Sequence, residues 1–214
     1  MSETVPLDLS VDRVRVFLDG EIVGSLTLSP AKTVAFSYES SWLSSGFSIS
    51  PLSLPLREGV FVAKRDPLHG LFGVFDDSMP DGWGRLLTDR LLRQRGIDPY
   101  SIGTLTRLSI VGSSGMGALE YEPAAVIENS VAATDLDDIA RECANLLETD
   151  FSEDLDQLFA LGGSSGGARP KILTEVDGEE WIIKFPSSVD SANIGEQELS
   201  LIHISEPTRP ERIS

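Results

Sequence analysis

The chain has 214 residues, of which 41% are hydrophobic, enough for one or two domains with a buried core. Acidic residues outnumber basic ones by 34 to 17, and the net charge of −17 would repel nucleic acid, so we expect no direct contact with DNA or RNA. Cys143 is the only cysteine, which excludes an internal disulfide and fits a reducing compartment. The sequence shows neither an apolar run long enough to span a membrane nor a signal peptide. We therefore expect a cytoplasmic protein.

The first part of the chain predicts a β-hairpin. Residues 14–18 and 22–28 are rich in β-branched and apolar side chains, and they flank Asp19-Gly20, a pair typical of two-residue turns. Residues 43–55 are interrupted by Ser and Pro and predict irregular structure.

Helix signals follow. Pro80-Asp81 predicts a helix start and Gly96 its end, and the apolar stripe between them consists of Trp83, Leu86, Leu87 and Leu91. Asp98-Pro99 predicts a second helix start.

Two more helices are predicted before residue 161. A capping box at residues 134–137 begins an amphipathic helix, and Cys143 lies on its apolar face, which favours core packing over reactivity. Residues 152–160 predict another short helix.

Residues 161–185 combine a glycine-rich loop, a hairpin and a strand lysine. Gly162, Gly163, Gly166 and Gly167 allow backbone amides to approach a phosphate closely. Residues 171–176 and 179–185 predict two strands, and Lys184 lies where a cation can reach an α- or β-phosphate. This order predicts an ATP site, although a flexible linker would explain the Gly/Ser run alone.

The same loop also matches the G-x-S-x-G pattern of α/β-hydrolases at residues 163–167. That motif needs a preceding strand, a following helix and a later histidine. A predicted helix precedes the loop here, Pro170 interrupts the segment after it, and the only later histidine is His203. The hydrolase interpretation is therefore excluded.

Several motifs, in order, resemble the HipA family of serine/threonine kinases, the toxins of bacterial toxin–antitoxin modules. The loop ends in Gly-Ala-x-x-Lys at residues 167–171, and Ile-Ile-Lys-Phe-Pro follows at residues 182–186. Glu198 best matches the family's glutamate at the next helix. The N-terminal matches are residues 14–26, 36–38, 42–43, 50–51, 75–85 and 115–119. The resemblance covers roughly residues 11–198 and depends on the order of motifs rather than on any one.

The resemblance implies an α+β fold, with a HipA-type mixed α/β N-terminal domain followed by the first strands of a protein-kinase-like N-lobe. It implies binding of ATP with Mg²⁺ in the intact parent protein, and it implies no metal site within this chain. The implied nucleotide-binding residues are Gly162, Gly163, Ser164, Ser165, Gly166, Gly167, Ala168, Lys171, Lys184 and Glu198. Ser164 is the implied site of inhibitory autophosphorylation, with Ser165 the next best match.

The expected organisation has five parts. An N-terminal extension spans residues 1–10, the HipA-like N-terminal domain residues 11–124, an acidic helical connector residues 125–160, and the start of an ATP-binding lobe residues 161–198. Residues 199–209 resemble the translation of a transposase sequencing adapter. We therefore expect residues 199–214 to be a non-native tail without a fixed place in the structure.

The catalytic residues of a kinase are not found in the sequence. The aspartate that orients the substrate hydroxyl and the Asn and Asp that hold Mg²⁺ follow the lysine strand in kinases, and no candidate follows Glu198. We therefore expect a fragment of a kinase toxin that phosphorylates a cellular protein, and we expect the fragment itself to be inactive.

The resemblance further implies neutralisation by a helix-turn-helix, DNA-binding antitoxin. Between Asp135 and Asp156 the chain carries nine acidic residues and one Arg, which fits either a solvated helix face or a docking surface for a basic antitoxin. The sequence leaves a second function open, that of a non-catalytic protein-binding module.

Overall fold

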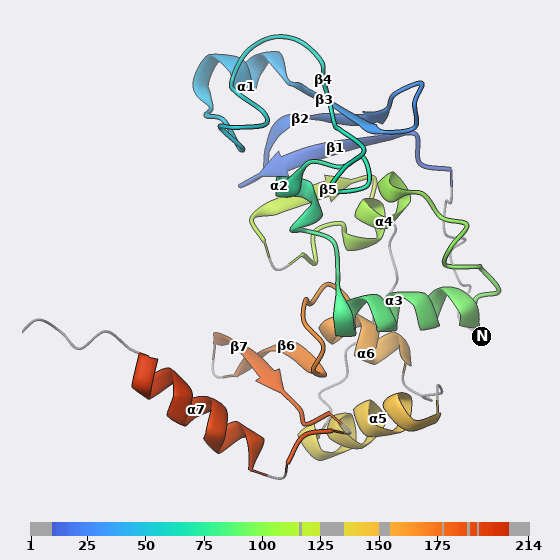
Figure 1. The fold of residues 1–214 in the computed structure, drawn as a ribbon, viewed down its shortest axis with the longest axis vertical. Coiled ribbons are helices and arrows are strands. Elements are labelled where there is room, and N and C mark those ends of the chain that lie inside the picture. Colours follow the sequence, from blue (N-terminus) through green and yellow to red (C-terminus); the bar gives the residue numbers. More distant parts are fainter. Residues whose placement is uncertain are drawn as a thin grey trace, which may run out of the picture.

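The computed structural model describes residues 10–115, 117–124, 135–149, 155–176, 178–187, 189–191 and 193–205. Within this part of the chain the fold is mixed α/β. A five-stranded sheet with its helices occupies one half of the molecule, and a two-stranded hairpin with four helices occupies the other (Figure 1). The coarse fold-class prediction is confirmed.

The larger sheet is antiparallel, with strand order β4-β3-β2-β1-β5. Its strands are β1 (Arg13–Leu18), β2 (Glu21–Leu28), β3 (Val34–Tyr38), β4 (Phe61–Val62) and β5 (Leu119–Glu122). The predicted β1–β2 hairpin is confirmed, and its turn has positive φ at both Asp19 (51°) and Gly20 (77°). Such φ values give a turn whose twist matches that of the flanking strands.

The first hydrophobic core lies against this sheet. Val14 and Val16 are fully buried while their neighbours Arg13 and Arg15 are exposed, the alternation expected of a strand with one buried face. Three short helices accompany the sheet: α1 (Ser40–Ser45), α2 (Gly73–Asp76) and α4 (Thr104–Val111). Their buried side chains in this core are Trp42, Phe75, Leu105, Leu108 and Val111.

The second core joins segments that are far apart in the sequence. It is built from α3 (Gly82–Gln94), α5 (Leu136–Thr149), α6 (Leu155–Gly162), β6 (Lys171–Val176) and β7 (Glu179–Lys184). Helix α3 contributes Trp83, Leu87, Leu91 and Leu92. Although α3 lies within residues 11–124, it therefore packs with the segments that follow residue 135.

Cys143 belongs to this second core, as predicted for a packing residue. Burial, followed by the negative charge of Glu142, raises the pKa of its thiol to about 12. The thiolate is the reactive form of cysteine, so this side chain is inert at neutral pH.

The helix start predicted at Asp98-Pro99 is wrong, because α4 begins at Thr104. The Asp98 carboxylate accepts the Tyr100 N–H at 3.0 Å, and the Asp98 carbonyl accepts the Ser101 hydroxyl at 2.7 Å. Short polar side chains that bond their own backbone in this way favour turns over helices.

Residues 199–205 are helical and form the end of α7 (Ile194–Ser205), and residues 206–214 lie outside the described part of the chain. The expectation that residues 199–214 are a loosely placed, non-native tail stays a prediction. Helix hydrogen bonds are local, so a segment that contains good helix formers such as Leu199 and Leu201 can be helical without a tertiary partner.

Leu108 and Leu52 provide a matched test of the first core. Leu108 is 0% exposed and Leu52 is 101% exposed. Leu108→Ala should lower the free energy of unfolding by about 2–5 kcal/mol because it removes buried methyl groups and leaves a cavity. Leu52→Ala should change it by less than about 0.5 kcal/mol. Urea unfolding monitored by circular dichroism measures both, and equal losses would contradict the placement of this core.

Candidate functional site

The glycine-rich loop, residues 162–167, is docked on the beginning of helix α3. The Gly167 N–H donates a short hydrogen bond to the Asp81 carboxylate, and the Trp83 N–H donates to the Gly167 carbonyl at 2.7 Å. In Figure 1 the segment between α6 and β6 lies beside the first turn of α3. The two segments therefore exchange backbone and side-chain hydrogen bonds across 86 positions of sequence.

Two glycines in α3 make this close approach possible. A Cβ atom on Gly84 would lie 2.2 Å from the Ser165 carbonyl oxygen, and one on Gly82 would lie 2.3 Å from the Gly167 carbonyl oxygen. Gly82 also has a φ of +44°, which L side chains rarely adopt. A glycine destabilises a helix by about 1 kcal/mol relative to alanine. The close approach of the loop explains why glycine occupies both positions despite this cost.

Three amides of the loop already have acceptors within the protein. Besides the Gly167 amide, the Gly163 N–H donates to the Phe159 carbonyl at 2.7 Å, and the Ser165 N–H donates to the Gly162 carbonyl at 3.0 Å. These amides were predicted to contact phosphates, so phosphate binding would require the loop to rearrange.

The two serines of the loop differ in access. Ser165 is fully buried, and its hydroxyl donates to the Gly162 carbonyl at 2.6 Å. Ser164 is half-buried and lines an open cleft. Of the two serines, Ser164 is therefore the one that a phosphate group could reach without unpacking the loop.

The two lysines of the hairpin face each other across β6 and β7. Lys171 is directly opposite Lys184 in the strand register. Lys171 is buried and donates a short hydrogen bond to the Gly166 carbonyl, whereas the Lys184 side chain is 49% exposed. Burial lowers the pKa of Lys171, the positive charge of Lys184 lowers it further, and the Asp81 carboxylate opposes both effects.

Glu198 on α7 pairs with the strand lysine. Its carboxylate lies 2.5 Å from Lys184 Nζ and 2.8 Å from the Arg169 guanidinium. The hydrogen bond from Lys184, then the charge of Lys184, lowers the pKa of Glu198. The carboxylate therefore stays ionised at neutral pH and holds two cations from different segments.

Arg169 is fixed in turn by Asp190. The Arg169 Nε atom lies 3.1 Å from the Asp190 carboxylate, which is 10% exposed. The same carboxylate accepts the Ser187 N–H at 2.9 Å and the Ser187 hydroxyl at 2.8 Å. These two bonds, the N–H first, and then Arg169 lower the pKa of Asp190.

A cleft of about 560 Å³ opens beside the docked loop. Helix α3, the segment before it and the glycine loop form its walls. It is lined by Asp76, Asp77, Ser78, Met79, Pro80, Asp81, Arg85, Thr88, Arg107, Ser164 and Gly166. Its lining carries charges of both signs, and one of the cations, Arg107, lies 3.3 Å from Asp89.

The structure brings most of the predicted site residues together. Residues 162–167, Lys171, Lys184 and Glu198 form one connected group, and Ala168 is exposed at its edge. Within the described ranges, no group of three or more His, Cys, Asp or Glu residues is arranged to hold a metal ion. Nor does any helix in those ranges have the length and apolar character to cross a membrane.

Sequence reasoning missed Asp81, Gly82 and Gly84 as parts of this site, and it missed Arg169 and Asp190. A helix start alone accounts for the pattern at residues 79–82. Two glycines within the first turn of a helix were the available signal, because they are unfavourable there unless another backbone packs closely. No local pattern indicates that Asp190 would contact Arg169.

Comparison with known proteins finds a family model and several solved structures that match this chain. A sequence model of the HipA N-terminal domain matches residues 14–122. A solved complex of HipA, HipB and operator DNA from Shewanella oneidensis MR-1 matches with a TM-score of 0.44 and 20% sequence identity. The alignment covers 81% of this chain and 38% of that chain. No curated protein matches the sequence.

Substitution of Gly84 tests the docking of the loop. Gly84→Ala should destabilise the protein by about 1–3 kcal/mol, because the new methyl group overlaps the Ser165 carbonyl and forces the backbones apart. Gly195→Ala is the matched control, since a Cβ there meets nothing within 4 Å. The control should be neutral or slightly stabilising in the same urea titration. Equal behaviour of the two variants would show that the loop does not pack on α3.

Proposed function

The chain belongs to the HipA family, and on that premise we propose that it supplies the N-terminal domain and the first nucleotide-contacting segments of a serine/threonine kinase toxin. The chain covers 38% of the matched chain of the Shewanella complex, so phosphotransfer is proposed for a longer parent protein. In that parent, Mg·ATP would supply the transferred phosphoryl group and a cellular protein would accept it.

One observation supports this function above the others: the ion pair between Lys184 and Glu198, at 2.5 Å, follows a glycine-rich loop in the sequence. Protein kinases require a strand lysine, paired with a helix glutamate, to hold the α- and β-phosphates. A linker or a structural hairpin has no need for this arrangement.

We assign roles to the residues of the site on this basis. Lys184 would bind the phosphates, Glu198 would orient Lys184, and the amides of residues 162–167 would donate to phosphate oxygens once the loop leaves α3. Ala168 and Lys171 follow the loop in the sequence and would lie beside the bound nucleotide. These segments hold and orient the nucleotide, and they carry out no transfer step themselves.

Ser164 is the proposed site of inhibitory phosphorylation. A phosphate there would add about −1.5 to −2 charge beside Asp81 and at the place proposed for nucleotide phosphates. Repulsion would expel either the loop or the ligand. Its position in the cleft, in contrast to buried Ser165, supports this assignment.

A DNA-binding antitoxin is the proposed partner, and the cytoplasm the proposed location, as for the toxins of this family. The net charge of −17 disfavours contact between this chain and DNA, so any operator binding would come through that partner. The Shewanella complex is named for HipA, HipB and operator DNA.

The alternative function is a non-catalytic protein-binding module. The observation that favours it is the docked loop, whose Gly163, Ser165 and Gly167 amides bond within the protein. A module would bind its protein partner equally well with and without ADP, whereas a nucleotide-responsive kinase segment would not.

Binding of ADP to the 214-residue chain tests the proposal. We expect a dissociation constant on the order of millimolar, because these segments offer one wall of a nucleotide site. Lys184→Ala should weaken binding about tenfold or more, since it removes a charge-assisted hydrogen bond to phosphate. Isothermal titration calorimetry or ligand-detected NMR measures this range, and phosphorylation of a protein substrate by the chain should be undetectable.

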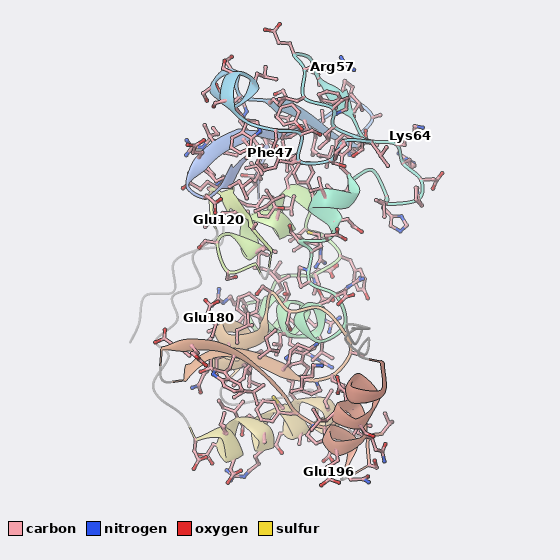
Figure 2. The ribbon with its side chains drawn as sticks, turned by 90° about the vertical axis from the view of Figure 1, so that its left-hand side faces the viewer. Phe47, Arg57, Lys64, Glu120, Glu180 and Glu196 are labelled. Atoms are coloured by element: carbon pink, nitrogen blue, oxygen red, sulfur yellow. The ribbon has the colours of Figure 1, made fainter. Side chains whose placement is uncertain are left out.

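Lys64→Ala is the matched control. Lys64 is exposed and lies in the sheet half of the molecule, far from the β6–β7 hairpin that carries Glu180 (Figure 2). Its substitution removes one positive charge without touching the site, so ADP affinity should stay within about twofold. Equal affinity of wild type and Lys184→Ala would contradict the proposed role of Lys184.

A further inference from the structure

Asp81 does not use its side chain for its own helix. It occupies the N-cap position of α3, where a carboxylate usually accepts an N–H from the first turn, yet it makes no such hydrogen bond. Instead the carboxylate accepts the N–H of Gly167. Its interaction is therefore with the glycine loop.

The place that this carboxylate occupies has the character of an anion site. Gly167 has a φ of +81°, a conformation typical of loops whose amides converge on an anion, and the carboxylate lies close to Gly166. The buried Lys171 ammonium contacts the same loop at the Gly166 carbonyl. A backbone amide and a lysine thus meet a negative charge that comes from the protein itself.

We propose that the Asp81 carboxylate is an internal competitor of phosphate for the glycine loop, so that the loop accepts an anion only when it leaves Asp81. This inference rests on the proposed function, since it assigns the inactive arrangement of the same loop. The Gly167 N–H is satisfied by one acceptor at a time, and a carboxylate beside it repels an incoming phosphate.

Two features indicate that the docked arrangement can be displaced. The indole N–H of Trp83 is buried next to Gly162 and has no hydrogen-bond partner among the described residues, which costs free energy in the docked arrangement. Asp81 itself is exposed and lines the open cleft. A dissolved anion can therefore approach the Gly167 N–H that Asp81 occupies.

Asp81→Asn tests the competition in the full 214-residue chain. The substitution keeps the shape of the side chain and removes its charge. Inorganic pyrophosphate should bind this variant about tenfold more tightly than it binds wild type, because a neutral amide holds the Gly167 N–H less strongly than a carboxylate and does not repel the incoming anion. Calorimetry gives the affinity, and the amide resonance of Gly167 in ¹⁵N NMR spectra should shift on titration.

Asp77→Asn is the control, because Asp77 lines the same cleft and the change of charge is identical. Its affinity for pyrophosphate should stay within about twofold of wild type. Equal affinity of Asp81→Asn and Asp77→Asn, an unmoved Gly167 resonance, or no binding of pyrophosphate by any variant would overturn the inference.

Failure of the inference is distinguishable from failure of the proposed function. If wild type binds ADP and Lys184→Ala loses it, while Asp81→Asn gains nothing over Asp77→Asn, the competition is wrong and the nucleotide site stands. If neither ADP nor pyrophosphate binds to any of these variants, both are wrong.

Discussion

The close contact between the glycine loop and the first turn of α3 is the constraint on which the rest of the site depends. Gly84 meets the carbonyl of Ser165 at a distance that leaves no room for a side chain, and the Trp83 amide donates to the Gly167 carbonyl. This contact ties the segment after residue 155 to a helix that lies between β4 and β5 in the chain.

Two lysines and two carboxylates lie around this contact, and their charges offset one another. Lys171 and Lys184 are adjacent on β6 and β7, and two like charges directly opposite each other destabilise a strand pair. Asp81 approaches the loop from one side and Glu198 approaches Lys184 from the other. The carboxylates therefore compensate the positive charge of the lysines, a role that the proposed nucleotide phosphates would share.

The ion pairs of α7 are partly exposed, and this limits what they contribute to stability. Glu198, Lys184 and Arg169 each keep a third or more of their side-chain surface in water, where ion pairs are typically worth less than about 1 kcal/mol. Their importance lies in orientation. Arg169, fixed by Asp190, brings a second cation to Glu198 and so restrains the carboxylate that holds the proposed phosphate-binding lysine.

Sequence patterns predicted those helices and strands that depend on residues close together in the chain. Asp19-Gly20 and the alternation in β1 predicted the first hairpin, and the apolar stripe of α3 predicted that helix. The glycine loop was recognised, but its docking on Asp81 was not, because the partner lies 86 positions away. At Asp98 the local pattern itself was misleading, because an Asp-Pro pair fits a turn as well as a helix start.

Amide hydrogen exchange at Gly167 and Trp83 tests the docking most directly. If the loop is held on α3, both amides should exchange far more slowly than the amide of an exposed turn residue such as Gly59, and Asp81→Ala should accelerate both together. Exchange of Gly167 and Trp83 at the rate of Gly59 in the wild-type chain would show that the loop is free of α3 and would contradict the central contact.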